Sequence, residues 1–205
     1  DLMVTPGTEH RFVVMTSPVG PYFAGELGLV TTREYVRAFP GGTGDIKPSG
    51  NYAGSLLATR KAQEAGYQNV IWLDGIERRW VEECGVMNVF FVLDGVAVTP
   101  PLEGTILPGV TRDSLLQLLR DMNHPVEERR VSVEELREAG EAGTLEEAFG
   151  CGTAATVVPI HRLGLDGVDV RLASPPDSLA ARLKAELIGI QTGRIEDRHG
   201  WLTRL

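Results

Sequence analysis

The sequence predicts an α+β fold with a sheet-rich core. Strand-like and helix-like runs are mixed along the chain without a repeat, and no change in composition marks a linker. The composition, 42% hydrophobic and 23% charged, is that of an ordinary globular domain. We therefore expect residues 1–205 to form one domain.

The first third of the chain contains four expected elements. Short runs of apolar and β-branched residues predict strands at 11–16, 34–39 and 69–73. Between the last two, apolar side chains recur with helical spacing from residue 51 to residue 65, and Gly66 is typical of a helix end. The side chains expected on the buried face of this helix are Ala53, Leu56, Leu57, Ala58, Ala62 and Ala65.

The rest of the chain begins with a predicted hairpin, 88–93 and 96–99, joined at Asp94-Gly95, a favoured two-residue turn. Ser132 and Glu135 form a capping-box pattern that predicts a short helix. Residues 153–160 are β-rich, and we expect Asp177 to cap a final helix, whereas residues 193–205 have no assignment. The apolar faces expected on the two longer helices are Leu115, Leu118, Leu119 and Met122, and then Leu179, Leu183, Leu187 and Ile188.

Charge and composition exclude several classes of partner. A formal net charge of −8 opposes binding to nucleic acid or to an anionic membrane surface. No apolar run approaches the roughly 20 residues that span a bilayer, and the start of the chain lacks the pattern of a signal peptide, so we expect a cytoplasmic protein. Cys84 and Cys151 lack metal-ligand spacing; we expect two buried thiols and no metal. The absence of an initiator methionine suggests a truncated or processed chain.

One lysine stands apart from the other two. Lys61 and Lys184 lie on the polar sides of expected helices, whereas Lys47 lies in the glycine-rich stretch 41–52, where the backbone could approach a ligand closely. A P-loop is excluded because Pro48 follows the lysine directly. A lysine held between a strand and a helix, and shielded from water, could lose its proton and form an imine. On these residues alone, a structural turn remains the other interpretation.

Five blocks of sequence, in order, resemble the large, C-terminal domain of branched-chain amino acid aminotransferases, which are enzymes of fold type IV that use pyridoxal 5'-phosphate (PLP). The blocks are residues 17–23, 41–52, 83–88, 99–112 and 149–154. This resemblance implies a D-amino acid aminotransferase-like fold, in which a β-barrel-like sheet core is flanked by helices. It also implies that a small N-terminal domain precedes these residues in the family and is absent from this chain.

The resemblance implies a role for each residue that matches the family's motifs. Lys47 would bind PLP covalently and carry the proton in catalysis, Tyr52 would contact the cofactor's phenolic oxygen, and Glu83 would face its pyridine nitrogen. The neighbouring Glu82 is expected to face solvent, because alternation along an extended segment points the two carboxylates opposite ways. The family's remaining contacts match Leu107 on the ring face, Gly109, Val110 and Thr111 at the phosphate, Thr153 at the phosphate or substrate, Ala154 at the substrate carboxylate and Tyr22 at the substrate side chain.

Two departures from the family are visible. Val86 stands where relatives often carry a hydroxyl residue, so one side-chain contact to the cofactor is missing. The CxxC motif of some animal members is replaced by Ala155 and Val158, which makes regulation by thiol oxidation unexpected.

The implied function is transamination of L-leucine, L-isoleucine and L-valine with 2-oxoglutarate, by a homodimer. Because the small domain contributes to the cofactor and substrate sites, the chain alone is expected to bind PLP poorly and to turn over slowly or not at all. Two alternatives remain at this point: another fold type IV enzyme, such as a D-amino acid aminotransferase or an aminodeoxychorismate lyase, and a non-catalytic fragment.

Overall fold

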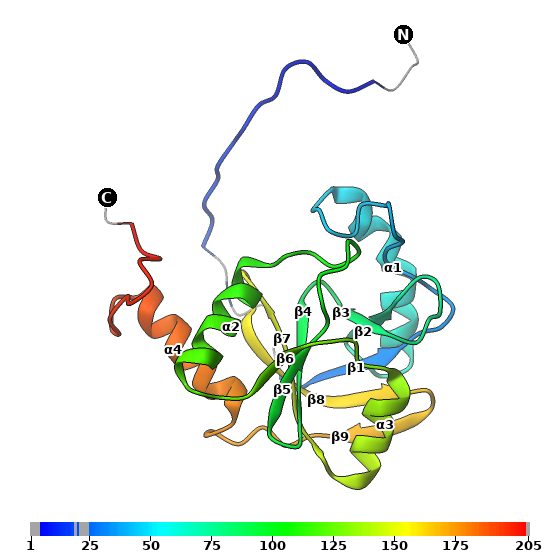
Figure 1. Cartoon of the computed structure of the whole chain (residues 1–205). Coiled ribbons are helices and arrows are strands. Elements are labelled where there is room, and N and C mark those ends of the chain that lie inside the picture. The colour runs from blue at the N-terminus through cyan, green and yellow to red at the C-terminus, as the bar shows by residue number, and fades with distance from the viewer. Residues whose placement is uncertain (1–4, 19, 21–24, 204–205) are drawn as a thin grey trace.

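The computed structural model of the chain describes residues 5–18, 20 and 25–203. In this part of the chain, four helices flank a curled mixed sheet of nine strands (Figure 1), which confirms the expected α+β class. The strands are β1 (Leu27–Thr31), β2 (Asn69–Leu73), β3 (Val81–Cys84), β4 (Asn88–Leu93), β5 (Val96–Thr99), β6 (Val126–Glu128), β7 (Leu145–Gly152), β8 (Thr156–Leu165) and β9 (Val168–Arg171). The helices are α1 (Ser49–Glu64), α2 (Val110–Asp121), α3 (Val133–Ala142) and α4 (Leu179–Gln191).

Strand β8 joins the two halves of the sheet. The strand order is β3-β2-β1-β8-β7-β4-β5-β6, and β9 also pairs with β8. The ten residues of β8 pair antiparallel with β7 near their start, antiparallel with β9 near their end and parallel with β1 along most of the second half. The sheet therefore turns at this strand, and the site lies where segments from both halves meet.

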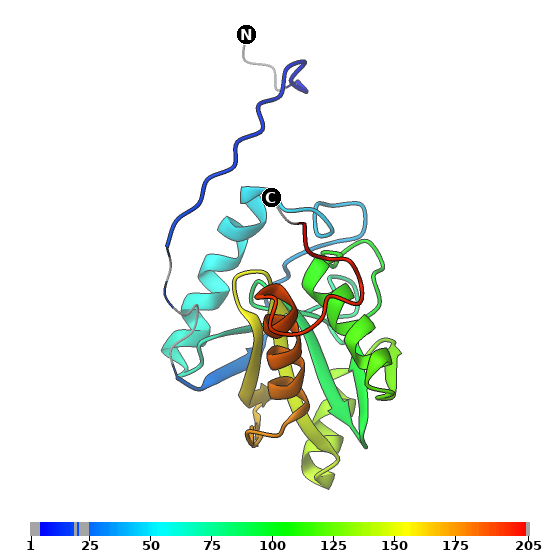
Figure 2. The same ribbon diagram turned by 90° about the vertical axis from the view of Figure 1, so that its left-hand side faces the viewer.

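Side chains alternate between two cores on opposite faces of the sheet. Phe90 of β4 faces α2 and α4, where its ring stacks on Phe149 with the centroids 5.2 Å apart. The next residue, Phe91, faces the core that contains Leu136 of α3. Figure 2 shows α2 and α4 side by side over the strands, away from α3. Successive side chains of a strand point to opposite faces of the sheet, so a strand in a sheet that is buried on both faces contributes to both cores.

Several local predictions are confirmed. Asp94 and Gly95 both have positive φ, 47° and 75°, as a tight hairpin turn needs. Helix α2 buries the predicted leucines, and Met122 lies half-buried at its end. Helix α3 begins at the predicted cap, where the Ser132 hydroxyl accepts the Glu135 N–H at 3.0 Å. Cys84 and Cys151 are buried thiols, as expected.

The predicted strand at 11–16 is wrong. These residues have no strand partner among the described residues, and in both views they lie apart from the sheet (Figures 1 and 2). Phe12 and Met15 are 91% and 88% exposed. An apolar alternation predicts a strand only if another strand supplies its hydrogen bonds, and here the described chain supplies none.

The predicted strand at 34–39 is also wrong, and the strand of this region is β1. The hydroxyl of Thr32 accepts the N–H groups of Glu34 and Tyr35 at 3.3 and 3.4 Å, which closes a turn directly after β1. Farther along, the Arg37 side chain donates to the carbonyl oxygens of Gly44 and Thr105, so the segment is fixed by side-chain contacts.

Three details of the helices and turns differ from expectation. In α1 only Ala58 and Ala62 are buried, against Val70 and Trp72, whereas Leu56 and Leu57 are 67% and 54% exposed. Helix α4 is capped by Ser178, whose hydroxyl accepts the Ala181 N–H at 3.2 Å, and not by Asp177. Residues 153–155 form the turn before β8. In the described part of the chain, no helix is both long and apolar enough to cross a membrane.

Candidate active site

Lys47 lies on the loop between β1 and α1, two residues before the helix begins. The Asn51 side chain holds this loop: its amide nitrogen donates to the carbonyl oxygens of Thr43 and Ile46 at 2.7 and 3.1 Å, and its oxygen accepts the Thr43 hydroxyl at 2.7 Å. Gly44 packs so closely that an added Cβ would lie 2.5 Å from the Ala38 Cβ and would collide with the Thr105 carbonyl oxygen. The glycine stretch therefore serves close packing of the loop, which fixes the backbone of Lys47.

Lys47 itself is exposed, in contrast to the shielding from water that we expected. Tyr52, five residues on and within α1, is 38% exposed. Both side chains line the same cavity, which opens to solvent, and this explains why they are exposed.

Glu83 in β3 is the buried carboxylate of the site. Its Oε2 lies 3.3 Å from Nε of Arg37, whose side chain is itself 9% exposed, and its Oε1 accepts the Leu107 N–H at 2.9 Å. Burial raises the pKa of Glu83 to about 7, although the Arg37 guanidinium and the Leu107 N–H both favour the ionised form. Glu83 can therefore gain or lose a proton near neutral pH.

The loop that leads into α2 is positioned by Asn88, which sequence reasoning missed. The Asn88 side chain donates to the Leu107 carbonyl oxygen at 2.9 Å, and Gly109 packs against its oxygen so closely that a Cβ there would collide with it. Helix α2 begins after Gly109, and no side chain among the described residues caps it. Its first N–H groups are thus free to meet an anion, and the helix dipole favours one there.

These elements surround one cavity of about 480 Å³, which we call the Lys47 cavity. It is lined by Lys47, Tyr52, Glu83, Val86, Met87, Asn88, Leu107, Pro108, Gly109, Val110, Thr111, Cys151, Gly152, Thr153, Ala154 and Ala155. Nine of the ten predicted site residues are in this set; the tenth, Tyr22, lies outside the described residues. Segments from both halves of the sheet thus meet at one cavity. The role of each residue in binding stays a prediction.

Sequence reasoning misjudged Glu82 and missed Arg37. Glu82 is only 6% exposed and does not face solvent, because the loop before α2 covers it and the Thr105 hydroxyl donates to its Oε1. Nothing in the sequence separates Arg37 from the other basic residues, since its contacts, Glu83 and Thr105, are distant along the chain. A buried acid in an apolar strand was the available signal that a cation must lie nearby.

Comparison with known proteins identifies the family and the fold of this chain. Residues 6–163 match the family described as amino-transferase class IV, and the chain belongs to this family. The branched-chain-amino-acid aminotransferase of Mycobacterium tuberculosis (strain ATCC 25618 / H37Rv) is 48% identical over 212 residues, which cover 100% of this chain and 58% of that protein. The resemblance to branched-chain aminotransferases is therefore confirmed, and the chain spans a little over half the length of this relative.

Solved structures lead to the same group. The branched-chain amino acid aminotransferase from Escherichia coli superimposes with a TM-score of 0.73 at 32% identity, over 87% of this chain and 57% of that one. The branched-chain aminotransferase from Thermoproteus uzoniensis, solved with norvaline, has a TM-score of 0.75 at 30% identity, over 91% of this chain and 59% of that one. Each of these structures therefore shares its fold with this chain over a little more than half of its own length.

Proposed function

We propose that this chain is the PLP-binding part of an aminotransferase that exchanges the amino group between L-leucine, L-isoleucine or L-valine and 2-oxoglutarate. The observation that carries the proposal is the Lys47 cavity, in which a lysine, a tyrosine, a buried carboxylate and an uncapped helix start converge. Because the chain covers 58% of its curated relative, the full reaction is proposed for the protein that contains these residues, and cofactor binding is proposed for the chain itself.

The residues of the cavity fit the parts of PLP one by one. Lys47 is the amine that can bind the aldehyde, and the N–H groups of Val110 and Thr111 suit a phosphate dianion. Tyr52 supplies a hydroxyl for the phenolic oxygen, and Leu107 supplies an apolar surface for one face of the ring. A volume of about 480 Å³ is within the usual range for a cofactor site.

Glu83 and Lys47 would perform the chemistry of this chain. When bound, PLP supplies a ring that accepts the electrons released as the substrate's Cα–H bond breaks. Glu83, opposite the pyridine nitrogen, would hold a proton there, and a carboxyl with a pKa of about 7 is suited to share one. Lys47 would take the proton from the substrate Cα and return it on the cofactor side, which requires the mobility that its exposed position allows.

The substrate would enter beside the turn that follows β7. Thr153 and Ala154 line the cavity there, and the backbone of such a turn can donate to a substrate carboxylate. An apolar pocket separates leucine from valine by only about 1–3 kcal/mol per methylene, so we propose that all three branched-chain amino acids are accepted. We further propose that the protein acts in the cytoplasm as a homodimer.

The test is covalent capture of PLP on the chain. After incubation with PLP and reduction with borohydride, peptide mapping by mass spectrometry is expected to find the pyridoxyl group on Lys47. Addition of L-leucine before reduction should lower this labelling more than an equal concentration of D-alanine does, because both amines react with the cofactor aldehyde but only L-leucine suits the proposed substrate site. Labelling confined to Lys61 or Lys184 would contradict the proposal, and protection by D-alanine alone would favour a D-amino acid aminotransferase.

A further inference from the structure

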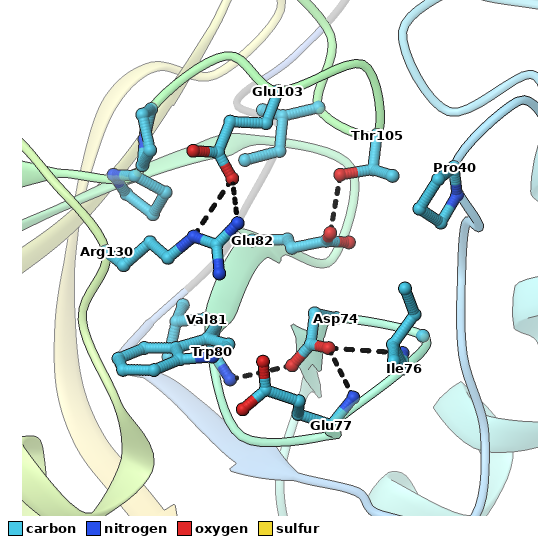
Figure 3. Close-up of a pocket in the computed structure, with 14 residues that line it drawn as sticks. Pro40, Asp74, Ile76, Glu77, Trp80, Val81, Glu82, Glu103, Thr105 and Arg130 are labelled. Atoms are coloured by element: carbon cyan, nitrogen blue, oxygen red, sulfur yellow. Dashed lines mark hydrogen bonds and ion pairs between the residues drawn. The ribbon is translucent and has the colours of Figure 1, made fainter.

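A second cavity lies on the other face of β3 from Glu83. It has a volume of about 410 Å³, and we call it the Glu82 cavity. The successive residues Glu82 and Glu83 line different cavities, and on the loop before α2 Thr105 lines the Glu82 cavity whereas Leu107 lines the Lys47 cavity. Figure 3 shows Glu82 extending from the strand toward Thr105, with Asp74 and Trp80 below it in this view. The two cavities are thus separated by a single strand and a single loop.

The lining of the Glu82 cavity is strongly acidic. The lining contains four carboxylates, those of Asp74, Glu77, Glu82 and Glu103, and one guanidinium, that of Arg130, which gives a formal charge of −3. Two of the four acids have partners that compensate their charge fully. Asp74 accepts four backbone N–H groups at 2.6–3.1 Å, and Glu103 pairs with Arg130 at 2.9 Å. The potential in the hollow therefore attracts cations.

Glu82 is the buried acid that lacks a full set of partners. Its side chain is 6% exposed, Oε1 accepts the Thr105 hydroxyl, and Oε2 is buried with no hydrogen-bond partner among the described residues. Burial raises the pKa of Glu82, which is the expected response of a carboxylate short of donors. A buried polar atom without a partner costs about 1–3 kcal/mol, more if it is charged, so a donor in the hollow that reached this carboxylate would be bound favourably.

The remaining wall of the Glu82 cavity is largely apolar. Pro100, Pro101 and Ile106 lie on the loop after β5, and Val81 and Trp80 lie on the side of β3. Such a surface suits a short hydrocarbon body, whereas a bare metal ion would need several oxygen ligands around it, and the described residues contain no group of three or more potential metal ligands. We propose that the Glu82 cavity binds a small organic cation, whose primary ammonium group faces Glu82 and whose short aliphatic body packs on Pro100, Pro101 and Ile106.

This site is independent of the proposed transamination, because it uses none of the residues that line the Lys47 cavity. The experiment uses the 205-residue chain without PLP and n-butylammonium chloride as the probe, followed by NMR of backbone and indole N–H signals at constant ionic strength. We expect saturable shifts at Trp80, Thr105 and Ile106 with a dissociation constant of roughly millimolar, as a ligand of about five heavy atoms allows. Sodium butyrate, the anion with an equally short body, should not bind there.

Two variants make the assignment specific. Glu82→Gln should weaken binding of n-butylammonium at least tenfold, because it removes the charge that faces the ammonium. Glu141→Gln, at an exposed position of α3, is the matched control and should leave binding unchanged. Equal binding of butyrate or of n-butanol to the wild-type chain, shifts centred on Gly109 and Thr111, or no saturable shift at all would each overturn the proposal, whether or not Glu82→Gln folds.

Discussion

Glu82 and Glu83 are neighbours in β3 and are both buried, yet they differ in how their charge is compensated. Glu83 has the Arg37 guanidinium on one oxygen and the Leu107 N–H on the other, whereas Glu82 has one hydroxyl, that of Thr105. The difference shows that burial alone does not define a carboxylate's role. Among the described residues Glu83 has a partner for each oxygen, whereas one oxygen of Glu82 has none, and this is the carboxylate that we propose faces a cation.

Removal of Arg37 should have the largest effect on stability, because it takes away the cation that compensates Glu83. Arg37→Met leaves Glu83 without its cation and frees the Gly44 and Thr105 carbonyl oxygens, so the free energy of unfolding at pH 8 should fall by about 3–5 kcal/mol. The loss should be smaller at pH 6, because a protonated Glu83 needs no cation, and Arg37→Lys should restore part of it. Urea unfolding at the two pH values measures both effects.

The matched control is Arg60→Met. Arg60 pairs with Glu64 on the surface of α1, where the side chains are 77% and 63% exposed, and loss of such a pair costs less than about 1 kcal/mol. Equal losses for the Arg60 and Arg37 variants, or a loss at Arg37 that does not depend on pH, would contradict the role given to the buried pair.

The second largest effect concerns how stability depends on pH, which should differ between Glu83 and Glu82. The folded pKa of Glu83, about 7, lies above the ordinary value of 4.5, so the folded state binds the proton more tightly than the unfolded state does. Stability from this group is therefore present at low pH and is lost as pH rises through 7. Relative to Glu83→Gln, the wild type should lose on the order of 3 kcal/mol between pH 4.5 and pH 8.

Relative to Glu82→Gln, the wild type should also lose stability as pH rises, because burial raises the pKa of Glu82 as well. We expect this change to be smaller than that of Glu83→Gln, since Glu82 is the less deeply shifted of the two. Chemical denaturation of the three proteins from pH 4.5 to pH 8 gives the comparison. A wild-type stability that rises with pH relative to both variants would show that the carboxylates are ionised throughout this range.

The smallest expected effect concerns the loop between β1 and α1 that carries Lys47. Gly44→Ala places a methyl group against the Thr105 carbonyl and the Ala38 Cβ, and the shift of backbone this requires should cost about 1–3 kcal/mol. Gly54→Ala, within α1, meets no atom within 4 Å and should stabilise the chain by about 0.5–1 kcal/mol. Thermal unfolding of both variants is the measurement, and a stabilised Gly44→Ala would show that the loop is not closely packed.

Elements with local signals were predictable from the sequence. The Asp94-Gly95 turn, the Ser132 cap and the apolar face of α2 each depend on residues within one or two turns of chain, and all three are confirmed. Strand β1 was missed because its five residues are defined by parallel pairing with β2 and β8, which no local pattern encodes. The exposed 11–16 segment shows the converse error, a strand-like pattern without a partner strand among the described residues.

The candidate site was predictable to the extent that it resembles a family. Motifs place Lys47, Tyr52 and Glu83, and the structure brings these residues to one cavity. The residues that fix them in place, Arg37 and Asn88, act through contacts with distant segments and have no signature of their own. Burial of Glu82 likewise depends on the loop around Thr105. Alternation along β3 correctly predicted that Glu82 points away from Glu83, but it could not predict that this loop covers Glu82.

The central position of β8 also has a consequence for how the protein folds during synthesis. Leu27 of β1 pairs with Ile160 of β8, so the sheet cannot close until most of the chain has left the ribosome. Pairing across so long a separation is slow, because the chain entropy of the intervening loop must be lost first. Lys47 follows β1 and Thr153 precedes β8, so the Lys47 cavity should be among the last features to form and a nascent chain should not capture PLP before then.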